Sequence, residues 1–248
     1  MIHKTKGIVL RTVKYGETSL IVTIFTELFG VQTYMVNGAR SQKKGTSQAM
    51  MLQPAAILEL EVYHNELKSI QRIKESNWSI LYNTILSDVI KNSIALYMME
   101  LLYKTLKQPE SNTDLFYFCE DVLLQLDAAN ATIAANIPLF FSLQLTQFFG
   151  FKIQHPTFEL LSNESCYLDL IEGKFVQTMP NHTNVICDNA AMITAELLKV
   201  MHPSELDQIK LNKQNRRELL LHYQNYYAFH ISDFGQMKSL TVLQEVLG

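Results

Sequence analysis

The basic side chains near the start of the chain are the residues whose types and spacing suggest a chemistry. Residues 1–80 contain ten Lys or Arg and six Asp or Glu, a net charge of +4. Residues 81–248 contain eleven Lys or Arg and eighteen Asp or Glu, a net charge of −7, so the net charge of the whole chain is only −3. This asymmetry predicts that the first part alone meets a polyanion, with Lys and Arg contacting phosphate.

A polar, glycine-containing stretch at residues 40–48 is a loop by composition. Loops of small barrels often form the walls of a nucleic-acid groove, so its cations are candidate contacts to a DNA backbone. The candidates are Arg40, Lys43 and Lys44 in this loop, and Arg11 and Lys14 beside an earlier turn. The alternative interpretation is a solvated surface loop, since basic loops are common on proteins.

A predicted strand at residues 68–75 carries the other basic candidates. A tight two-residue turn before this strand sets Arg72 opposite Glu59 in the preceding strand. The same register leaves Lys68 and Lys74 without a directly opposed acid. We therefore expect Lys68 and Lys74 to contact DNA, and Arg72 to stabilise the barrel through a cross-strand ion pair.

The sequence contains no motif of an enzyme active site. It lacks a phosphate-binding glycine loop, a dinucleotide-binding fingerprint, a nucleophile elbow and a zinc-protease helix. His222, His230 and Asp233 form a trio that could bind a metal, but an exposed or locally bonded histidine is the commoner case. We predict no catalytic residue, no cofactor and no metal.

The cysteines and the apolar stretches indicate in which cellular compartment the protein works. Three widely spaced cysteines without a C-x-x-C pair encode neither a disulfide framework nor a thiolate zinc site, which fits a reducing cytoplasm. The charges of Lys4 and Lys6 argue against a signal peptide. Residues 128–151 carry no charge, but their Asn, Gln and Pro residues favour a buried helix over a membrane span.

The elements that must position the basic side chains are short strands. Runs rich in β-branched residues, separated by turn residues, fall at residues 7–13, 19–26, 31–37, 57–63 and 68–75. Five strands with one longer connection before the fourth are typical of a small barrel. An OB-fold is the leading interpretation, and an SH3-like barrel is the alternative. We expect this barrel to be a DNA-binding domain at residues 1–78.

After Trp78 the apolar period changes to that of helices. Helices are predicted at residues 86–105, 113–126, 132–149, 189–200, 214–231 and 239–246. A hairpin is predicted within residues 164–179, turning at Glu172-Gly173. A tyrosine-rich run at residues 223–229 is a conceivable base-stacking platform, but its helical spacing favours packing. The whole reads as an α+β protein with a mainly helical domain at residues 79–248.

Segments at both ends and in the middle of the chain resemble the RecO recombination-mediator family. They are GIVLRTVKYGETSLIV at residues 7–22, YLDLIEGKFV at 167–176, YYAFHISDF at 226–234 and KSLTVL at 238–243. The resemblance covers nearly the whole chain. It implies an N-terminal OB-fold, a helical C-terminal domain and a non-enzymatic role in recombinational DNA repair, in a bacterial cytoplasm and at the nucleoid during repair.

The resemblance also implies partners. Members of this family bind single- and double-stranded DNA and anneal complementary strands. With RecR they help load a recombinase onto strands coated by single-strand-binding protein, whose acidic C-terminal tail they contact. We expect the tail pocket in residues 80–248 as an apolar groove with a basic rim, with Lys91, Lys104 and Lys152 as candidates.

The cysteines depart from the family pattern. Many relatives carry four cysteines that form a zinc site in the C-terminal domain, whereas only Cys166 and Cys187 fall in that region here. No zinc is therefore predicted. Two other functions stay open: a protein–protein adaptor whose barrel is only structural, and an RNA-binding barrel of the cold-shock type, whose aromatic-rich strands we do not find.

Overall fold

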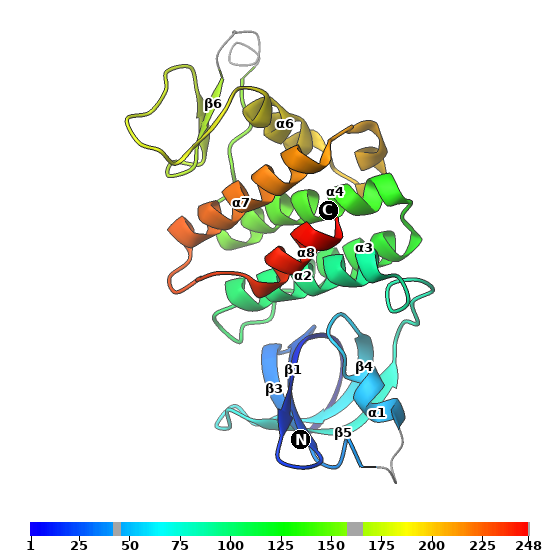
Figure 1. Ribbon diagram of the computed structural model, residues 1–248. Coiled ribbons are helices and arrows are strands. Elements are labelled where there is room, and N and C mark those ends of the chain that lie inside the picture. The colour runs from blue at the N-terminus through cyan, green and yellow to red at the C-terminus, as the bar shows by residue number, and fades with distance from the viewer. Residues whose placement is uncertain (42–45, 158–165, 248) are drawn as a thin grey trace. The chain divides into compact units, whose positions relative to one another are not determined.

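The computed structural model describes residues 1–41, 46–157 and 166–247. The chain forms two compact units (Figure 1). The barrel unit consists of Met1–Asp88 and Met99–Asp127, and the helical unit consists of Val89–Met98 and Ala128–Gly248. The last strand of the barrel ends at Trp78, where the sequence predicts the change from strands to helices. That residues 1–78 fold as a separate domain stays a prediction.

Five strands close into a barrel in the order β1-β2-β3-β5-β4, with β1 pairing with both β2 and β4. The strands are β1 (Ile2–Tyr15), β2 (Ser19–Thr26), β3 (Gly30–Val36), β4 (Ile57–Tyr63) and β5 (Gln71–Trp78). The contact between β3 and β5 is parallel and the other pairs are antiparallel. A short helix, α1 (Thr46–Met51), lies between β3 and β4 in the chain. The predicted five-stranded OB-fold barrel is confirmed.

The barrel interior is filled by alternate side chains of its strands. Leu20, Val22 and Ile24 of β2 are buried, as the period of two requires. β1 passes so close to its neighbours that Gly7 has no room for a side chain. A Cβ atom there would lie 2.6 Å from Ile24 and 2.9 Å from a methyl group of Leu60. Glycine at this position therefore permits the close packing of three strands.

The predicted register between β4 and β5 is wrong. Glu59 lies opposite Asn77, not Arg72, and Arg72 lies opposite Tyr63. The strand begins only at Gln71, because the buried side chain of Gln71 bonds to the backbone of the preceding loop and holds seven residues out of the ladder. A β-bulge after Glu61 shifts the register once more.

Two helices of the barrel unit follow the strands in the chain. They are the second part of α2 (Val89–Thr105) and nearly all of α3 (Thr113–Ala128). The ring of Phe116 on α3 packs against Phe25 of β2, with centroids 5.6 Å apart. Near the end of α3, the buried carboxylate of Asp127 accepts hydrogen bonds from the backbone N–H groups of residues 83, 84 and 85. These contacts join the segment after the barrel to α3.

Among the residues that the structure describes, the helical unit contains several helices and a small sheet (Figure 1). Besides residues 89–98 of α2, its elements are α4 (Ala131–Leu145), η1 (Thr146–Phe149), β6 (Tyr167–Asp169), β7 (Lys174–Val176), β8 (Val185–Cys187), α6 (Asp188–Lys199), η2 (Pro203–Gln208), α7 (Lys213–His230) and α8 (Lys238–Val246). The predicted hairpin is confirmed as β6 and β7, and β8 adds a third strand that the sequence pattern did not indicate.

The tyrosines of α7 are core residues. Tyr223, Tyr226 and Tyr227 are all buried, which confirms packing over base stacking for them. The hydroxyl of Tyr227 donates to the carbonyl of Ser142 on α4, and that of Tyr226 donates to the carbonyl of Phe151. Within the described ranges, no helix is both long enough and apolar enough to cross a membrane.

Candidate nucleic-acid interface

One row of solvent-facing side chains crosses the outside of the barrel. The ladder aligns Val13 with Ile21, Ile21 with Met35, and Met35 with Arg72, which lies beside Tyr63. Val13 and Tyr63 are 41% and 47% exposed, so the row lies on the outer surface. We call these five residues the strand face. It combines a flat apolar centre with a guanidinium and a phenol ring, which are groups that stack on nucleobases.

A second cation lies next to the strand face. Arg11 of β1 pairs with Thr23 of β2, two residues along from the pair of Val13 and Ile21 in the strand face. Its guanidinium donates to the hydroxyl of Tyr103 on α2 at 3.2 Å and lies 5.4 Å from the centre of that ring. Arg11 is therefore oriented by an aromatic partner of the same unit while its side chain stays exposed. Lys14, farther along β1, is also exposed.

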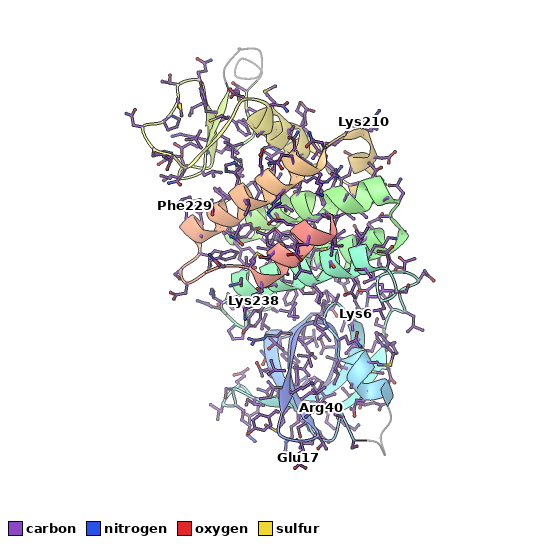
Figure 2. All side chains as sticks on the ribbon, in the orientation of Figure 1. Lys6, Glu17, Arg40, Lys210, Phe229 and Lys238 are labelled. Carbon is purple, nitrogen blue, oxygen red and sulfur yellow. The ribbon has the colours of Figure 1, made fainter. Side chains whose placement is uncertain are left out.

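The cations of the predicted basic loop are only partly described. Nη2 of Arg40 donates to the carbonyls of Gly16 and Glu17, at 2.8 and 2.6 Å. Arg40 and Glu17 thus lie at the same end of the barrel (Figure 2). Arg40 holds the β1–β2 turn in place, and its second amino group is not used in these bonds. Lys43 and Lys44 lie outside the described residues.

Lys74 was expected to have no acidic partner, but the structure places it beside Glu61. Its Nζ lies 2.7 Å from Glu61, which also receives Lys4 at 3.5 Å. The hydrogen bond with Glu61 raises the pKa of Lys74, and the hydrogen bond with Lys74 lowers the pKa of Glu61. Arg72, expected to pair with Glu59, instead has no ion-pair partner among the residues that the structure describes. In the observed register, therefore, Lys74 has the acidic partner that was expected for Arg72, and Arg72 has the open surroundings that were expected for Lys74.

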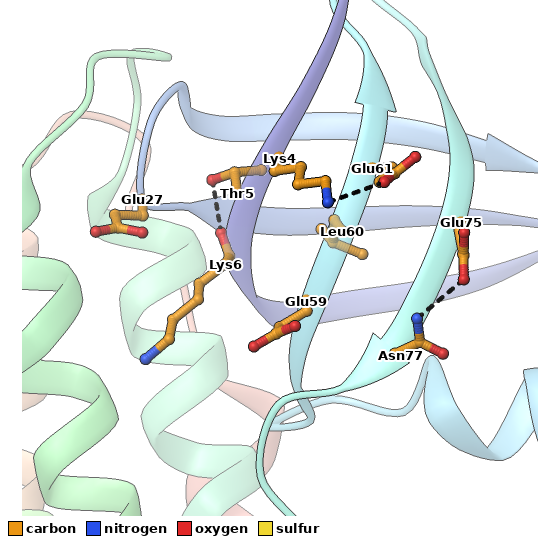
Figure 3. A pocket seen from close by; sticks show the side chains of 9 residues that line it. All are labelled: Lys4, Thr5, Lys6, Glu27, Glu59, Leu60, Glu61, Glu75 and Asn77. Carbon is orange, nitrogen blue, oxygen red and sulfur yellow. Dashed lines mark hydrogen bonds and ion pairs between the residues drawn. The ribbon is translucent and has the colours of Figure 1, made fainter.

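A pocket of about 400 Å³ on the β1–β4–β5 side is acidic, not basic (Figure 3). Four glutamates and two lysines line it with Thr5, Leu60 and Asn77. One of the lysines, Lys6, forms an ion pair at 2.9 Å with the buried Glu120 of α3. That partner raises the pKa of Lys6. The remaining negative charge makes this side of the barrel unsuited to phosphate.

A groove of about 640 Å³ borders the other end of β3. Its two main walls are the β2–β3 turn, which carries Leu28 and Phe29, and the loop at residues 64–70, and residues of β3 with Pro109 and Ser111 add to the lining. The rings of Phe29 and His64 stack with centroids 3.9 Å apart. Lys68 lies on the loop and is exposed, not within a strand as expected. We call this hollow the loop groove.

A basic cluster in the helical unit was missed by the sequence reasoning. Lys210, Lys213, Arg216 and Arg217 fall within eight residues that contain no acid, around the start of α7. Figure 2 labels Lys210 at that end of α7. Arg216 donates to the carbonyl of Leu211 at 2.6 Å, and burial lowers its pKa. The cluster was visible in the sequence as a run of cations, but the net acidic charge of residues 81–248 concealed it.

The cluster borders an apolar recess. The side chains of Leu220 on α7 and Leu247 after α8 line the recess together with Lys213, Arg216 and Arg217. No ion pair engages these cations within the described part of the chain. The predicted rim candidates are placed differently: Lys91 is buried in α2, Lys152 is exposed, and Lys104 belongs to the barrel unit.

Among the described residues, the cysteines of the helical unit do not form part of a metal site. Cys166 is buried before β6, and burial raises its pKa and that of Cys187. The nearby His182 lies 3.3 Å from Asp169, whose other oxygen accepts two backbone N–H groups. No group of three or more metal-ligand side chains comes together among residues 1–41, 46–157 and 166–247. The described residues therefore do not fit the zinc site of cysteine-rich relatives.

Comparison with known proteins gives a consistent result over the whole chain. A family model described as "Recombination protein O N terminal" matches residues 1–79, and one described as "Recombination protein O C terminal" matches residues 86–155. The chain is 32% identical to DNA repair protein RecO of Bacteroides fragilis over 247 residues, 99% of each chain. It is 30% identical to that of Azobacteroides pseudotrichonymphae over 246 residues, again 99% of each. The RecO of Flavobacterium psychrophilum is 32% identical over 244 residues, 98% of each.

Proposed function

The chain belongs to the RecO family of DNA repair proteins, and on that premise we propose that it binds and anneals single strands without enzymatic turnover. With RecR, it helps load a recombinase onto strands coated by single-strand-binding protein. This work takes place in the bacterial cytoplasm, at the nucleoid during repair. The proposed partners are single- and double-stranded DNA, RecR and the tail of the coating protein.

The observation that carries the proposal is the strand face. The side chains on the outer surface of a barrel are usually polar, because that face of each strand meets water. Here three aliphatic side chains, Val13, Ile21 and Met35, follow one another across three strands on that outer side. Unpaired bases offer flat apolar surface that can cover such a row, whereas the bases of a duplex are stacked and enclosed. This favours single strands.

Cations around the strand face supply the phosphate contacts. Arg72 lies within the face and Arg11 borders it, while Lys14, Arg40 and Lys68 lie on the adjoining strand end, turn and loop. Each phosphate that such a side chain neutralises releases a counterion, which makes the affinity fall as salt rises. Lys43 and Lys44 remain proposed contacts from the sequence. Lys74 is a weaker candidate because Glu61 already neutralises it.

A salt titration tests the proposal. A fluorescently labelled single strand is titrated with the full chain at several salt concentrations, and anisotropy gives the affinity. We expect micromolar or tighter binding that weakens steeply with salt. The double variant Arg11→Ala/Arg72→Ala is expected to lower the slope of log K against log salt by about 1.4, at about 0.7 for each lost phosphate contact.

The control removes the same charge from another place. Lys4 and Lys174 are exposed lysines that each lie 3.5 Å from a glutamate, so Lys4→Ala/Lys174→Ala changes the net charge equally. Equal losses in the two double variants would mean that only net charge matters. Absence of any binding at low salt would instead support the adaptor function, in which the barrel is structural and the helical unit binds a partner.

The recess beside the basic cluster of α7 is the proposed docking site for the tail of single-strand-binding protein. An acidic peptide with an apolar end requires cations around an apolar floor. Arg217 and Lys213 provide exposed cations, and Leu247 and Gln244 line the recess together with the nearly buried Leu220. This assignment replaces Lys91, Lys104 and Lys152 as the first candidates for the rim of the pocket.

A further inference from the structure

The loop at residues 64–70, between β4 and β5, carries the most exposed large apolar side chain among the residues that the structure describes. Leu67 is 95% exposed at its tip. A leucine in that position contributes almost no buried area to folding. Surface leucines are ordinary when they occur alone, but this one is adjacent to a groove and to the exposed cation Lys68.

Hydrogen bonds to the buried side chain of Gln71 fix the conformation of the loop. Gln71, only 3% exposed, donates through Nε2 to the carbonyls of Asn65 and Lys68, at 2.8 and 2.7 Å. Its Oε1 accepts the N–H of Asn65 at 3.0 Å. The side chain of Asn65 accepts the N–H of Leu67 at 2.9 Å, and the carbonyl of Asn65 accepts the N–H of Lys68. Five hydrogen bonds therefore fix the backbone that presents Leu67 to water.

The same glutamine connects the loop to the strand face. Gln71 is the first residue of β5 and pairs with Tyr34 of β3, and the next pair along is Arg72 with Met35. Met35 and Arg72 belong to the strand face. A strand of DNA lying across that face therefore reaches the loop groove without leaving the barrel surface.

The far wall of the loop groove is also apolar and aromatic. Leu28, 49% exposed, and Phe29 lie on the β2–β3 turn, and the two walls meet where the ring of Phe29 stacks at 3.9 Å on His64, the first residue of the loop. The groove volume of about 640 Å³ lies in the usual range for small organic ligands. An unstacked nucleobase has two apolar faces and polar edges, which suits a hollow with an apolar wall on each side.

We propose that the loop is a preorganised base-contacting element, in which Leu67 packs against an unstacked base of a single strand held in the loop groove. This inference rests on the proposed DNA binding of the strand face. Lys68 contacts the phosphate of the same nucleotide, and Gln71 is a positioning residue that acts through the loop. Glu66 also lines the groove, so a nucleic-acid occupant is favoured by the continuity of the groove with the strand face through Gln71 and Arg72.

The test compares two exposed leucines of the barrel unit. Leu67→Ala is expected to weaken binding of a single-stranded oligonucleotide about tenfold, because apolar area that the base covers is lost. The slope of log K against log salt stays unchanged, since no charge is removed. Leu81→Ala, which truncates a leucine that is 72% exposed, is the matched control and leaves the affinity unchanged.

A fluorescent base analogue reports the contact directly. We expect the fluorescence of 2-aminopurine within the oligonucleotide to change on binding to the wild type and much less with Leu67→Ala. Gln71→Ala tests whether the hydrogen bonds of Gln71 position Leu67. In a variant that already carries Gln71→Ala, Leu67→Ala is expected to lower the affinity little further, so the two losses of affinity are not additive. Circular dichroism shows whether Gln71→Ala keeps the fold, and Leu67→Ala supports or overturns the proposal by itself.

The outcomes separate this inference from the proposed function. If the wild type binds single strands and Leu67→Ala matches Leu81→Ala within twofold, the base contact is wrong while DNA binding stands. If the wild type does not bind DNA at any salt, the proposed function itself fails. If Leu67→Ala leaves DNA binding intact but abolishes binding of purified RecR, the loop contacts a protein and the proposal is overturned.

Discussion

Nζ of Lys74 lies 2.7 Å from Oε2 of Glu61, beside the bulge that shifts the register between β4 and β5. The contact neutralises the cation that the sequence pattern left free. Arg72, two residues earlier, lies opposite Tyr63 and Met35 and forms no ion pair within the described ranges. A shift in register has thus changed which side chain can meet a polyanion.

Arg72→Ala is expected to weaken single-strand binding and to lower the salt slope by about 0.7, because one phosphate contact is lost. Lys74→Ala is expected to change the slope much less, since Glu61 already holds that ammonium group. Anisotropy titrations at four salt concentrations measure both variants. A larger loss for Lys74→Ala than for Arg72→Ala would contradict the role of the strand face.

Arg217→Ala is expected to weaken binding of a peptide with an acidic, apolar C-terminus at least tenfold, through loss of a charged contact beside the recess. Lys199→Ala is the matched control in the same unit, because Glu196 lies 2.7 Å from that lysine. Isothermal titration calorimetry measures both. Equal affinity of the two variants for the peptide would remove the recess as the docking site.

Gly30→Ala is expected to destabilise the barrel by about 3 kcal/mol or more. Gly30 has a φ of +61°, and a Cβ atom there would lie 2.2 Å from the carbonyl oxygen of Glu110. Gly16→Ala is the control: its φ is +56°, but no atom lies within 4 Å of the added carbon. The Gly16→Ala variant loses only the free energy of placing alanine in the left-handed backbone conformation, about 1–2 kcal/mol. Urea unfolding separates the two, and equal losses would show that backbone conformation alone matters.

The stability of the barrel unit is expected to fall in acid through Asp127. Burial raises the pKa of Asp127, but hydrogen bonds from the N–H groups of residues 83, 84 and 85 outweigh this and hold it below the usual value. A carboxyl whose pKa is lowered on folding stabilises the protein above its unfolded pKa of about 4, and this contribution is lost as pH falls through the folded value. Unfolding free energies measured from pH 7 to pH 2 show the decline.

Asp127→Ala is expected to remove that part of the pH dependence. The variant also loses about 1–3 kcal/mol at pH 7, since the N–H of the buried Ile85 is left without an acceptor. Asp121→Ala changes an exposed acid on the same helix and serves as the control. An unaltered pH profile in Asp127→Ala would assign the acid sensitivity to other carboxyl groups.

The strands and most helices could be predicted from the sequence because each has a local cause. β2 and β4 match their predicted bounds, since alternation of buried and exposed residues marks them. Gly150, with a φ of +79°, ends η1 in the left-handed conformation that its type suggests. β8 has only three residues, too few for a period to be read.

The candidate site was harder to predict because it depends on pairing between strands. Which residue lies beside Arg72 is decided by the length of the loop before it, and that length follows from the hydrogen bonds of Gln71. No local pattern reveals these bonds. Likewise, Val13, Ile21 and Met35 are 22 residues apart in the chain at most, and only the ladder brings them into one row.

The bond between Asp127 and the backbone of Thr84 spans 43 residues, and it has a consequence for synthesis on the ribosome. All five strands leave the ribosome before α3 does. Until α3 emerges, the nascent barrel lacks the carboxylate that holds residues 83–85, the ring of Phe116 against Phe25 and the Glu120 partner of Lys6. A barrel unit that folds as it is translated therefore completes its packing only with its last helix, and slow elongation through α3 would lengthen the life of an incompletely packed barrel.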